Sequence, residues 1–221
     1  MKLFKNRFFL MITLLLLPLL LLACGGEDED DDNGDDNGDN NVEETGADLS
    51  QSFTATAQGA SVTFQHPEGW AAAQEEATGQ IYIANSAETL DSIQNDPDYA
   101  PAGDQVGMVL VPFPAASMGA DATPASVLEM MGGETGLAEG GVTELTVDGK
   151  AISKIEIAEE GNTGAGYAVS AEDGYILFMA LVADDYAQYE AIATAILASA
   201  SVSAEEAAEP MEETPEATPG N

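Results

Sequence analysis

The sequence predicts an α+β fold, in which a mainly antiparallel β-sheet is covered by helices on both faces. Short runs of alternating apolar and polar residues, joined by Asp-Gly turns, are typical of antiparallel hairpins. The run Gln105–Val111 is apolar after its first residue, as expected of a central strand that is buried on both sides. Three other segments combine a helix-start signal with apolar residues at helical spacing. Together these observations favour a layered α/β/α sandwich.

The first predicted strands form a hairpin. They are Phe53–Ala57 and Ser61–Gln65, and they flank a turn at Gln58-Gly59-Ala60. A further strand is predicted at Gln80–Ala84, where two isoleucines alternate with other residues and share one face. The central strand Gln105–Val111 follows.

The second half of the chain predicts a meander of four strands. These are Val142–Val147, Ala151–Ile157, Ala165–Ser170 and Tyr175–Val182. Asp148-Gly149 joins the first two strands and is the strongest hairpin signal in the chain. Asp173-Gly174 joins the last two.

Two internal helices are predicted from their start signals. Asn85-Ser86-Ala87-Glu88 resembles a capping box ahead of a short apolar stripe. Thr123 is a predicted N-cap before Pro124 at the first helical position, and Gly132 is the expected end of that helix.

The last predicted helix carries the clearest stripe. Asp185 is its expected cap and Gln188 sits at the reciprocal position. Its apolar face consists of Tyr186, Tyr189, Ala193, Ile196 and Leu197.

The start of the chain indicates export. Lys2, Lys5 and Arg7 precede a short apolar run, which is the pattern of a secretory signal, here residues 1–23. Leu21-Leu22-Ala23-Cys24-Gly25 resembles the bacterial lipobox. The resemblance implies cleavage before Cys24 and lipid attachment to its thiol, with acyl chains such as palmitate holding the protein at the extracytoplasmic face of the cell membrane. An uncleaved signal anchor, or ordinary cleavage with a free cysteine, is the alternative.

Composition divides the rest of the chain into three parts. Residues 24–48 are acidic and rich in Gly and Asn, which predicts an extended tether, because such a segment cannot bury a core. Residues 49–203 are long enough for one domain with its own core. Residues 204–221 mix Glu, Pro, Ala and Thr and predict a disordered tail.

The tether contains a weak calcium candidate. Asp35, Asn37 and Glu44 occupy positions where a calcium loop places oxygen ligands, and Asp39 adds a neighbouring carboxylate. The loop lacks its usual apolar anchor, since Asn40 stands there, and it lacks helical flanks. Loose condensation of divalent cations on a charged segment is the competing interpretation.

Charge excludes several partners. The chain has 40 acidic and 5 basic residues, and only Lys150 and Lys154 follow Cys24. Nucleic acid requires a cationic footprint, so it is excluded as a partner, and charged partners are expected to be cations or basic proteins. The acid excess has three interpretations: solubility, adaptation to a saline medium, or capture of divalent cations.

Few residues suit catalysis or metal binding. His66 is the only histidine and Cys24 the only cysteine, so no zinc site is expected. A catalytic pair of a nucleophile and a histidine would have to use His66. A lone histidine before proline is typical of a turn or a surface position. The glycine-rich segments 132–141 and 161–166 lack the phosphate-loop lysine and are expected to be loops. No cofactor is predicted.

The stretch "SVTFQHPEGW", Ser61 to Trp70, resembles the corner of the PsbP-like and Mog1-like superfamily, and the segment from Gly174 to Val202 resembles the final strand and helix of that family. The resemblance implies an antiparallel sheet between helices over residues 49–203. Photosynthetic members dock on photosystem II through basic residues, and these have few counterparts here. Pro67 and Gly69 shape the corner, and Trp70 is expected to return into the core.

The sequence therefore favours a non-enzymatic lipoprotein, anchored at the extracytoplasmic face of the cell membrane, that binds an unidentified envelope protein or a small ligand. Two alternatives remain open. One is an envelope hydrolase that uses paired carboxylates, and the other is a cation-binding surface protein.

Overall fold

The computed structural model describes residues 48–96, 99–119, 121–135, 138–159 and 162–204. The larger sheet consists of β3 (Ala71–Gln74), β4 (Ile81–Ala84), β5 (Val106–Pro114), β6 (Ala138–Val147), β7 (Lys150–Glu159), β8 (Asn162–Ser170) and β9 (Tyr175–Ala183). The smaller sheet consists of β1 (Leu49–Ala57), β2 (Ala60–Pro67) and β10 (Ser201–Ala204). The helices are α2 (Ala87–Asn95), α3 (Pro124–Thr135) and α4 (Glu190–Ser199), with 3₁₀ turns η1 (Ala115–Ser117), η2 (Glu172–Gly174) and η3 (Tyr186–Tyr189).

All strand pairs in the larger sheet are antiparallel, in the order β3-β4-β5-β9-β8-β7-β6. The predicted meander is confirmed, because β6 to β9 follow one another in both the chain and the sheet. The predicted central strand is also confirmed: β5 lies between β4 and β9, and its residues are buried from Val106 to Phe113. Pairing with β4 stops at Leu110, so the prolines at the end of β5 face only one neighbouring strand, a position that proline tolerates.

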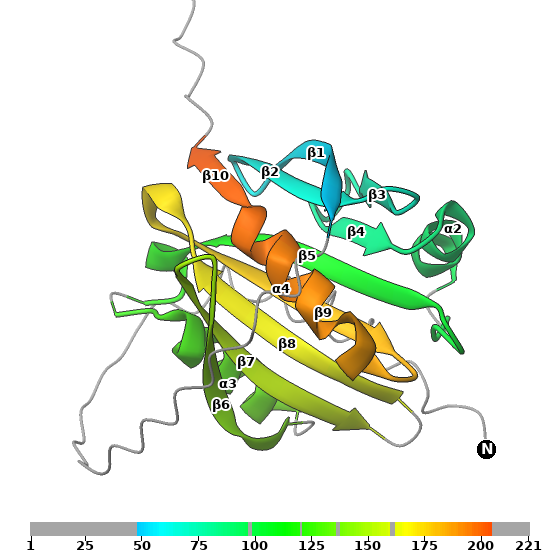
Figure 1. Ribbon diagram of the computed structural model, residues 1–221. Helices are drawn as coiled ribbons and strands as arrows, with labels where there is room; N and C mark the ends of the chain where they lie inside the picture. Colours follow the sequence, from blue (N-terminus) through cyan, green and yellow to red (C-terminus); the bar gives the residue numbers. More distant parts are fainter. Residues whose placement is uncertain (1–47, 97–98, 120, 136–137, 160–161, 205–221) are drawn as a thin grey trace, which may run out of the picture.

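Helices cover both faces of the larger sheet, so the predicted fold class is confirmed (Figure 1). On one face, α4 lies across β8 and β9, and the smaller sheet packs beside it. On the other face, α2 and α3 pack through Leu90, Ile93, Val127 and Leu128. The larger sheet therefore separates two apolar cores.

The hairpin turns follow the local chemistry that predicted them. Asp148 and Gly149 both have positive φ, 50° and 77°, as a two-residue hairpin turn requires. Gln58 and Gly59, at 53° and 75°, form the same kind of turn between β1 and β2. Ala60, expected in that turn, is instead the first residue of β2.

Two strands were not predicted. The sequence of β3 is Ala-Ala-Ala-Gln, which shows no alternation of apolar and polar residues. Its extended conformation is stabilised by pairing with β4. β10 pairs with the outer side of β2 and converts the first hairpin into a three-stranded sheet. Each has four residues, too few for a periodic signal.

Helix ends differ from expectation in three places. The N-cap of α2 is Ser86, whose hydroxyl accepts from the N–H of Thr89 and pairs with its side chain, so the start lies one residue later than the Asn85–Glu88 pattern suggests. α3 continues through Gly132 to Thr135. Asp185 precedes the turn η3, and its carboxylate accepts from the Gln188 side chain and not from a backbone N–H.

The described residues of the two glycine-rich segments lie in a helix and in strands, contrary to the expected loops. Segment 132–141 contributes to α3 and β6, and β8 covers all but the first residue of segment 161–166. A Cβ on Gly164 would collide with the carbonyl of Leu181, and one on Gly166 would lie 3.1 Å from Ile155 and 3.4 Å from Leu128. These two glycines permit the close approach of β9 and α3.

Candidate functional site

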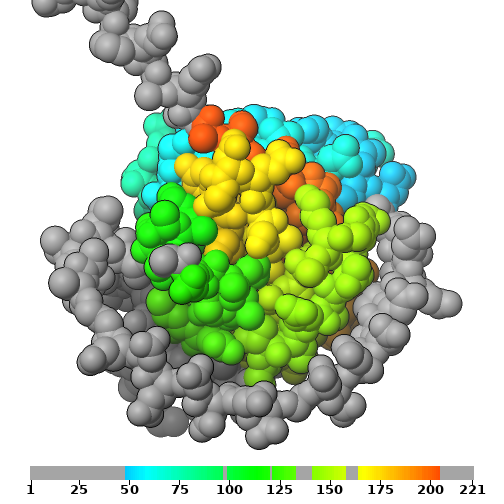
Figure 2. Space-filling view, turned by 90° about the vertical axis from the view of Figure 1, so that its left-hand side faces the viewer, coloured from blue at the N-terminus to red at the C-terminus, as the bar shows by residue number. Residues whose placement is uncertain are grey.

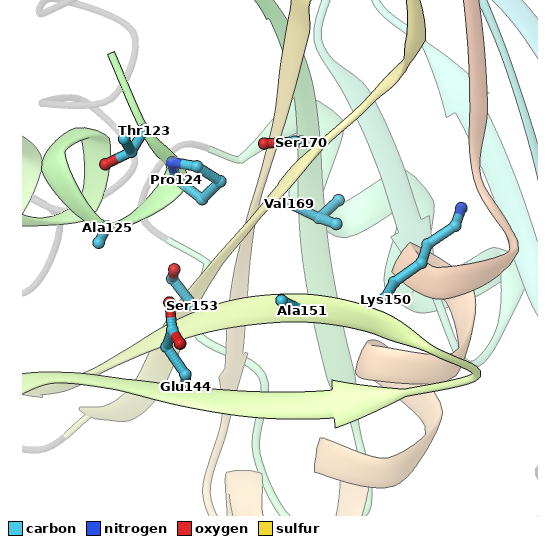
Figure 3. A pocket seen from close by; sticks show the side chains of 9 residues that line it. All are labelled: Thr123, Pro124, Ala125, Glu144, Lys150, Ala151, Ser153, Val169 and Ser170. Atoms are coloured by element: carbon cyan, nitrogen blue, oxygen red, sulfur yellow. The ribbon is translucent and has the colours of Figure 1, made fainter. Parts of the chain in front are cut away.

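A pocket of about 380 Å³ opens where the start of α3 meets the ends of β6, β7 and β8. Figure 2 shows the side of the molecule on which the green, lime and yellow segments carrying these elements come together. The lining residues are Thr123, Pro124, Ala125, Glu144, Lys150, Ala151, Ser153, Val169 and Ser170 (Figure 3). Its size lies at the lower end of the range for small-molecule sites.

Sheet register places the polar groups of one wall. Glu144 on β6 lies directly opposite Ser153 on β7, and Ser153 lies opposite Ala168 on β8. Because residues two apart on a strand share a face, Ser170 belongs to the same face as Ala168. Figure 3 shows the Glu144 carboxylate and the Ser153 hydroxyl side by side, with Ser170 across the pocket from them.

The opposite wall is the first turn of α3, where the predicted N-cap is confirmed. The hydroxyl of Thr123 accepts from the N–H of Ser126 at 3.1 Å, and the Ser126 hydroxyl accepts from the N–H of Thr123 at 2.9 Å. Pro124 has no N–H to satisfy, and the N–H of Val127 donates to the Thr123 carbonyl. This reciprocal cap leaves the N–H of Ala125 as the first-turn donor on the pocket side.

Lys150 lines the pocket only by its position on β7, because its side chain leaves on the face of Ile152, opposite to the face of Ala151 and Ser153. Its ammonium donates to the carbonyl of Ala200 at 2.9 Å, just past the end of α4 on the other face of the sheet. In Figure 3 the ammonium points away from the hydroxyl groups. Two of the nine lining residues are charged, Glu144 and Lys150. Because the Lys150 ammonium points away, only the Glu144 carboxylate presents a charge to the pocket.

The second lysine is the centre of a separate cluster under α4. Lys154 is 9% exposed, and its ammonium donates to both carboxylate oxygens of Glu190, at 3.0 and 2.9 Å. Glu156 lies 3.3 Å from the same ammonium, and the hydrogen bond from Tyr186 together with Lys154 lowers the pKa of its carboxyl. The Tyr186 ring stacks 5.5 Å from the ammonium.

Tyr167 lies opposite Lys154 in the β7–β8 register and is completely buried. Its hydroxyl has no hydrogen-bond partner among the described residues. Burial raises the pKa of this phenol strongly, followed by the effect of the nearby Glu190 carboxylate. The cluster fixes α4 on the sheet, and the Lys154 ammonium at its centre is already bound by the two glutamates.

His66 is part of the fold. It points inward at the end of β2 with 8% exposure, its Nδ1 lies 3.1 Å from the carbonyl of Pro67, and its ring centroid is 6.3 Å from that of Phe64. The expected turn or surface position is therefore wrong. The neighbouring corner is as expected, because Gly69 has a φ of 84° and Trp70 is half-buried against the core, edge-on to Tyr189.

Other predicted site residues lie outside the described part of the chain. These are the lipid-attachment candidate Cys24 and the calcium candidates Asp35, Asn37, Asp39 and Glu44. Within the described ranges, no group of three or more His, Cys, Asp or Glu residues is arranged to hold a metal ion. The helices of those ranges are all too short or too polar to cross a membrane.

Sequence reasoning missed the pocket residues, although one signal was present. A two-residue turn at Asp148-Gly149 fixes the register, and that register places Glu144 opposite Ser153. Ser153 is also a polar residue between Ala151 and Ile155 on an apolar face. No comparable signal links Thr123 to these strands, because α3 reaches them only through tertiary packing.

Comparison with known proteins yields similarities to solved structures alone. A scan against protein families gives no match, and a search of curated proteins gives none. The solution structure of cyanobacterial PsbP (CyanoP) from Synechocystis sp. PCC 6803 aligns with a TM-score of 0.41 and 13% identity, covering 83% of this chain and 99% of that one. The function proposed below therefore rests on this chain's own residues.

Proposed function

We propose that this protein is a bacterial lipoprotein, anchored at the extracytoplasmic face of the cell membrane, whose folded domain is a non-enzymatic binding module. Cys24 carries the lipid in this proposal, and the acidic segment 24–48 separates the anchor from the domain. The pocket between α3 and the β6–β8 strands is the binding site.

One observation carries the non-enzymatic part. The side chains most suited to acid–base chemistry are already used to hold the fold together: His66 packs against Phe64, Lys150 binds the Ala200 carbonyl, and Lys154 is paired with Glu190. The nine residues lining the pocket supply hydroxyl groups and one carboxylate. Such a set suits the binding of polar ligands, and Glu144 is the one group among these nine that could serve as a base beside the Ser153 hydroxyl.

The hydrolase alternative is less well supported by the same pocket. Glycoside hydrolysis uses two carboxyl groups, one on each side of the scissile bond. Glu144 is the one carboxylate among the nine lining residues. The wall facing it is formed by Thr123, Pro124 and Ala125, none of which can replace a second acid.

The anchor follows from the physics of acyl chains. Each buried CH₂ contributes about 0.8 kcal/mol, so a single chain binds a membrane weakly, while two or three chains hold a protein stably. An anionic protein gains nothing from acidic lipid headgroups, and the chains must supply the whole affinity.

Metabolic labelling with a clickable fatty acid tests the anchor. We expect the wild-type protein to incorporate label and to sediment with membranes, and the Cys24→Ser variant to do neither. Intact-mass analysis then gives a product that begins at Cys24 and carries the added lipid. Label incorporation that is independent of Cys24, or a product that starts elsewhere, would exclude a lipoprotein.

A further inference from the structure

The chemistry of the pocket narrows the kind of ligand that it accepts. Thr123, Ser153 and Ser170 provide hydroxyl groups that both donate and accept hydrogen bonds, while the carboxylate of Glu144 only accepts. A well-matched ligand must therefore offer donors to Glu144 and both kinds of group to the hydroxyls. Neighbouring hydroxyl groups on one small molecule meet both demands.

Ser153 is the strongest indication that a ligand belongs here. The residue is 4% exposed, it lines the pocket, and Figure 3 places its hydroxyl beside the Glu144 carboxylate. The pocket is therefore the space that this hydroxyl faces. A ligand hydroxyl in the pocket would satisfy Ser153 and, at the same time, reach the adjacent Glu144.

Charged ligands fit less well. A carboxylate or phosphate would face Glu144 with no cation to offset it, because the Lys150 ammonium is held by the Ala200 carbonyl on the other side of the sheet. A primary ammonium would suit Glu144, but it has no acceptor to offer the hydroxyl groups or the N–H of Ala125. It would also lie close to the positive end of the α3 dipole. A neutral ligand avoids both conflicts.

The remaining lining is aliphatic. Ala151, Pro124 and the methyl group of Ala125 form surfaces that can contact C–H groups. A ring with hydroxyl groups on its edge and C–H groups on its face matches this division between polar and apolar walls. The volume of about 380 Å³ leaves room for one such ring but not for a long chain.

We propose that the pocket binds one neutral sugar ring, with two neighbouring ring hydroxyl groups donating to the Glu144 carboxylate and the Ser153 and Ser170 hydroxyls completing the contacts. This assignment rests on the proposed function as a binding module. It makes the protein a receptor for neutral glycan at the cell surface.

Titration of the isotope-labelled, lipidated protein in detergent micelles tests the assignment. The probes are the methyl glycosides of D-glucose, D-mannose and N-acetyl-D-glucosamine, each raised to about 50 mM, since an open pocket of this size is expected to bind with a Kd on the order of 1 mM. We expect at least one of them to shift the amide signals of Ser153 and Ser170 in a saturable way.

Two variants and one control make the result decisive. Glu144→Gln keeps the shape of an exposed side chain and should weaken binding about tenfold, because a charge-assisted hydrogen bond is lost. Ser153→Ala should weaken it about fivefold. Glu76→Gln removes the same charge from an exposed turn far from the pocket in the chain, and should change nothing. If Ser153→Ala fails to fold, the comparison of Glu144→Gln with Glu76→Gln still tests whether the pocket binds the sugar.

Each other outcome has a distinct meaning. Absence of pocket shifts with all three glycosides overturns the sugar assignment, and so does equal weakening by Glu144→Gln and Glu76→Gln. Pocket shifts with 1,5-diaminopentane but with no glycoside assign an ammonium site instead. Release of free sugar from a bound methyl glycoside would overturn the proposed non-enzymatic function and leave the sugar site standing.

Discussion

At the scale of single residues, buried tyrosines are the most unusual feature. The chain has 6 tyrosines, and burial raises the pKa of Tyr82 and of Tyr167. Tyr82 donates to the side-chain carbonyl of Gln80 at 2.7 Å and, at 3.4 Å, to Glu75. Burial first, and then the Glu75 carboxylate, raise its pKa to about 12. The folded protein therefore holds this proton more tightly than the unfolded chain does.

This difference predicts a loss of stability at high pH. The unfolded phenol titrates near 10 and the folded one near 12, so the free energy of unfolding falls as the pH rises between these values. Tyr82→Phe should cost about 1 kcal/mol at neutral pH, where it removes a hydrogen bond, and its disadvantage should shrink towards about pH 12, because phenylalanine has no proton to lose. Urea unfolding of both proteins across this range measures the effect. A disadvantage that stays constant with pH would contradict it.

At the scale of secondary-structure elements, α4 is fastened at both ends by the only two lysines after Cys24. Lys150 reaches the Ala200 carbonyl at the C-terminal end of α4, where a cation also complements the helix dipole. Lys154 holds Glu190, the first residue of the helix. Both lysines lie on the same face of β7, two positions on either side of Ile152. A single strand thus sets the position of α4.

The ion pair under α4 predicts an unequal response to removing its two members. Glu190→Gln leaves the buried Lys154 ammonium with only Glu156, whose side chain is 58% exposed, and should cost about 2 kcal/mol. Lys154→Met removes the buried charge while filling similar volume, and Glu190, at 26% side-chain exposure, can be hydrated. We therefore expect Lys154→Met to cost less than about 1 kcal/mol. Denaturant midpoints of the two variants give the comparison.

A matched control is Glu88→Gln, which removes the corresponding first-turn glutamate of α2. Glu88 is exposed, so the loss should stay near 0.5 kcal/mol, roughly the value of a surface charge at a helix start. If Lys154→Met proves at least as damaging as Glu190→Gln, the lysine stabilises α4 mainly through its attraction to Glu190, and the argument from buried charge fails.

Elements differ in how far the sequence determines them. The Asp148-Gly149 and Asp173-Gly174 turns were predictable because they require positive φ, and Asp and Gly adopt positive φ more easily than most residues. β3 and β10 were not, because their hydrogen bonds come from strands distant in the chain. The residues that line the pocket also differ in how far the sequence predicts their positions. Glu144 and Ser153 follow from one hairpin register, while the approach of Thr123 depends on the packing of α3.

At the scale of the whole molecule, the charge distribution is the dominant property. Against 40 acidic residues, the two lysines after Cys24 are both occupied in holding α4, and His66 is buried. The surface of the described domain therefore offers acidic and neutral side chains with no free lysine or arginine. Repulsion among these carboxylates opposes the compact state, and it acts over the Debye length, about 10 Å at 0.1 M salt and about 3 Å at 1 M.

Stability should consequently rise with salt. Raising NaCl from about 0.05 M to about 1 M should increase the Tm by about 2–4 °C, corresponding to roughly 1 kcal/mol for a domain of this size. The buried Lys154–Glu190 pair is shielded from ions and should lose little over the same range.

Choline chloride at equal ionic strength separates the three interpretations of the acid excess. An equal rise indicates general screening, as expected for a protein adapted to salt, whereas a much larger rise with MgCl₂ at matched ionic strength indicates capture of divalent cations. A flat or falling Tm in all three salts leaves solubility as the role of the acids, because repulsion would then contribute too little to the free energy of unfolding to be relieved.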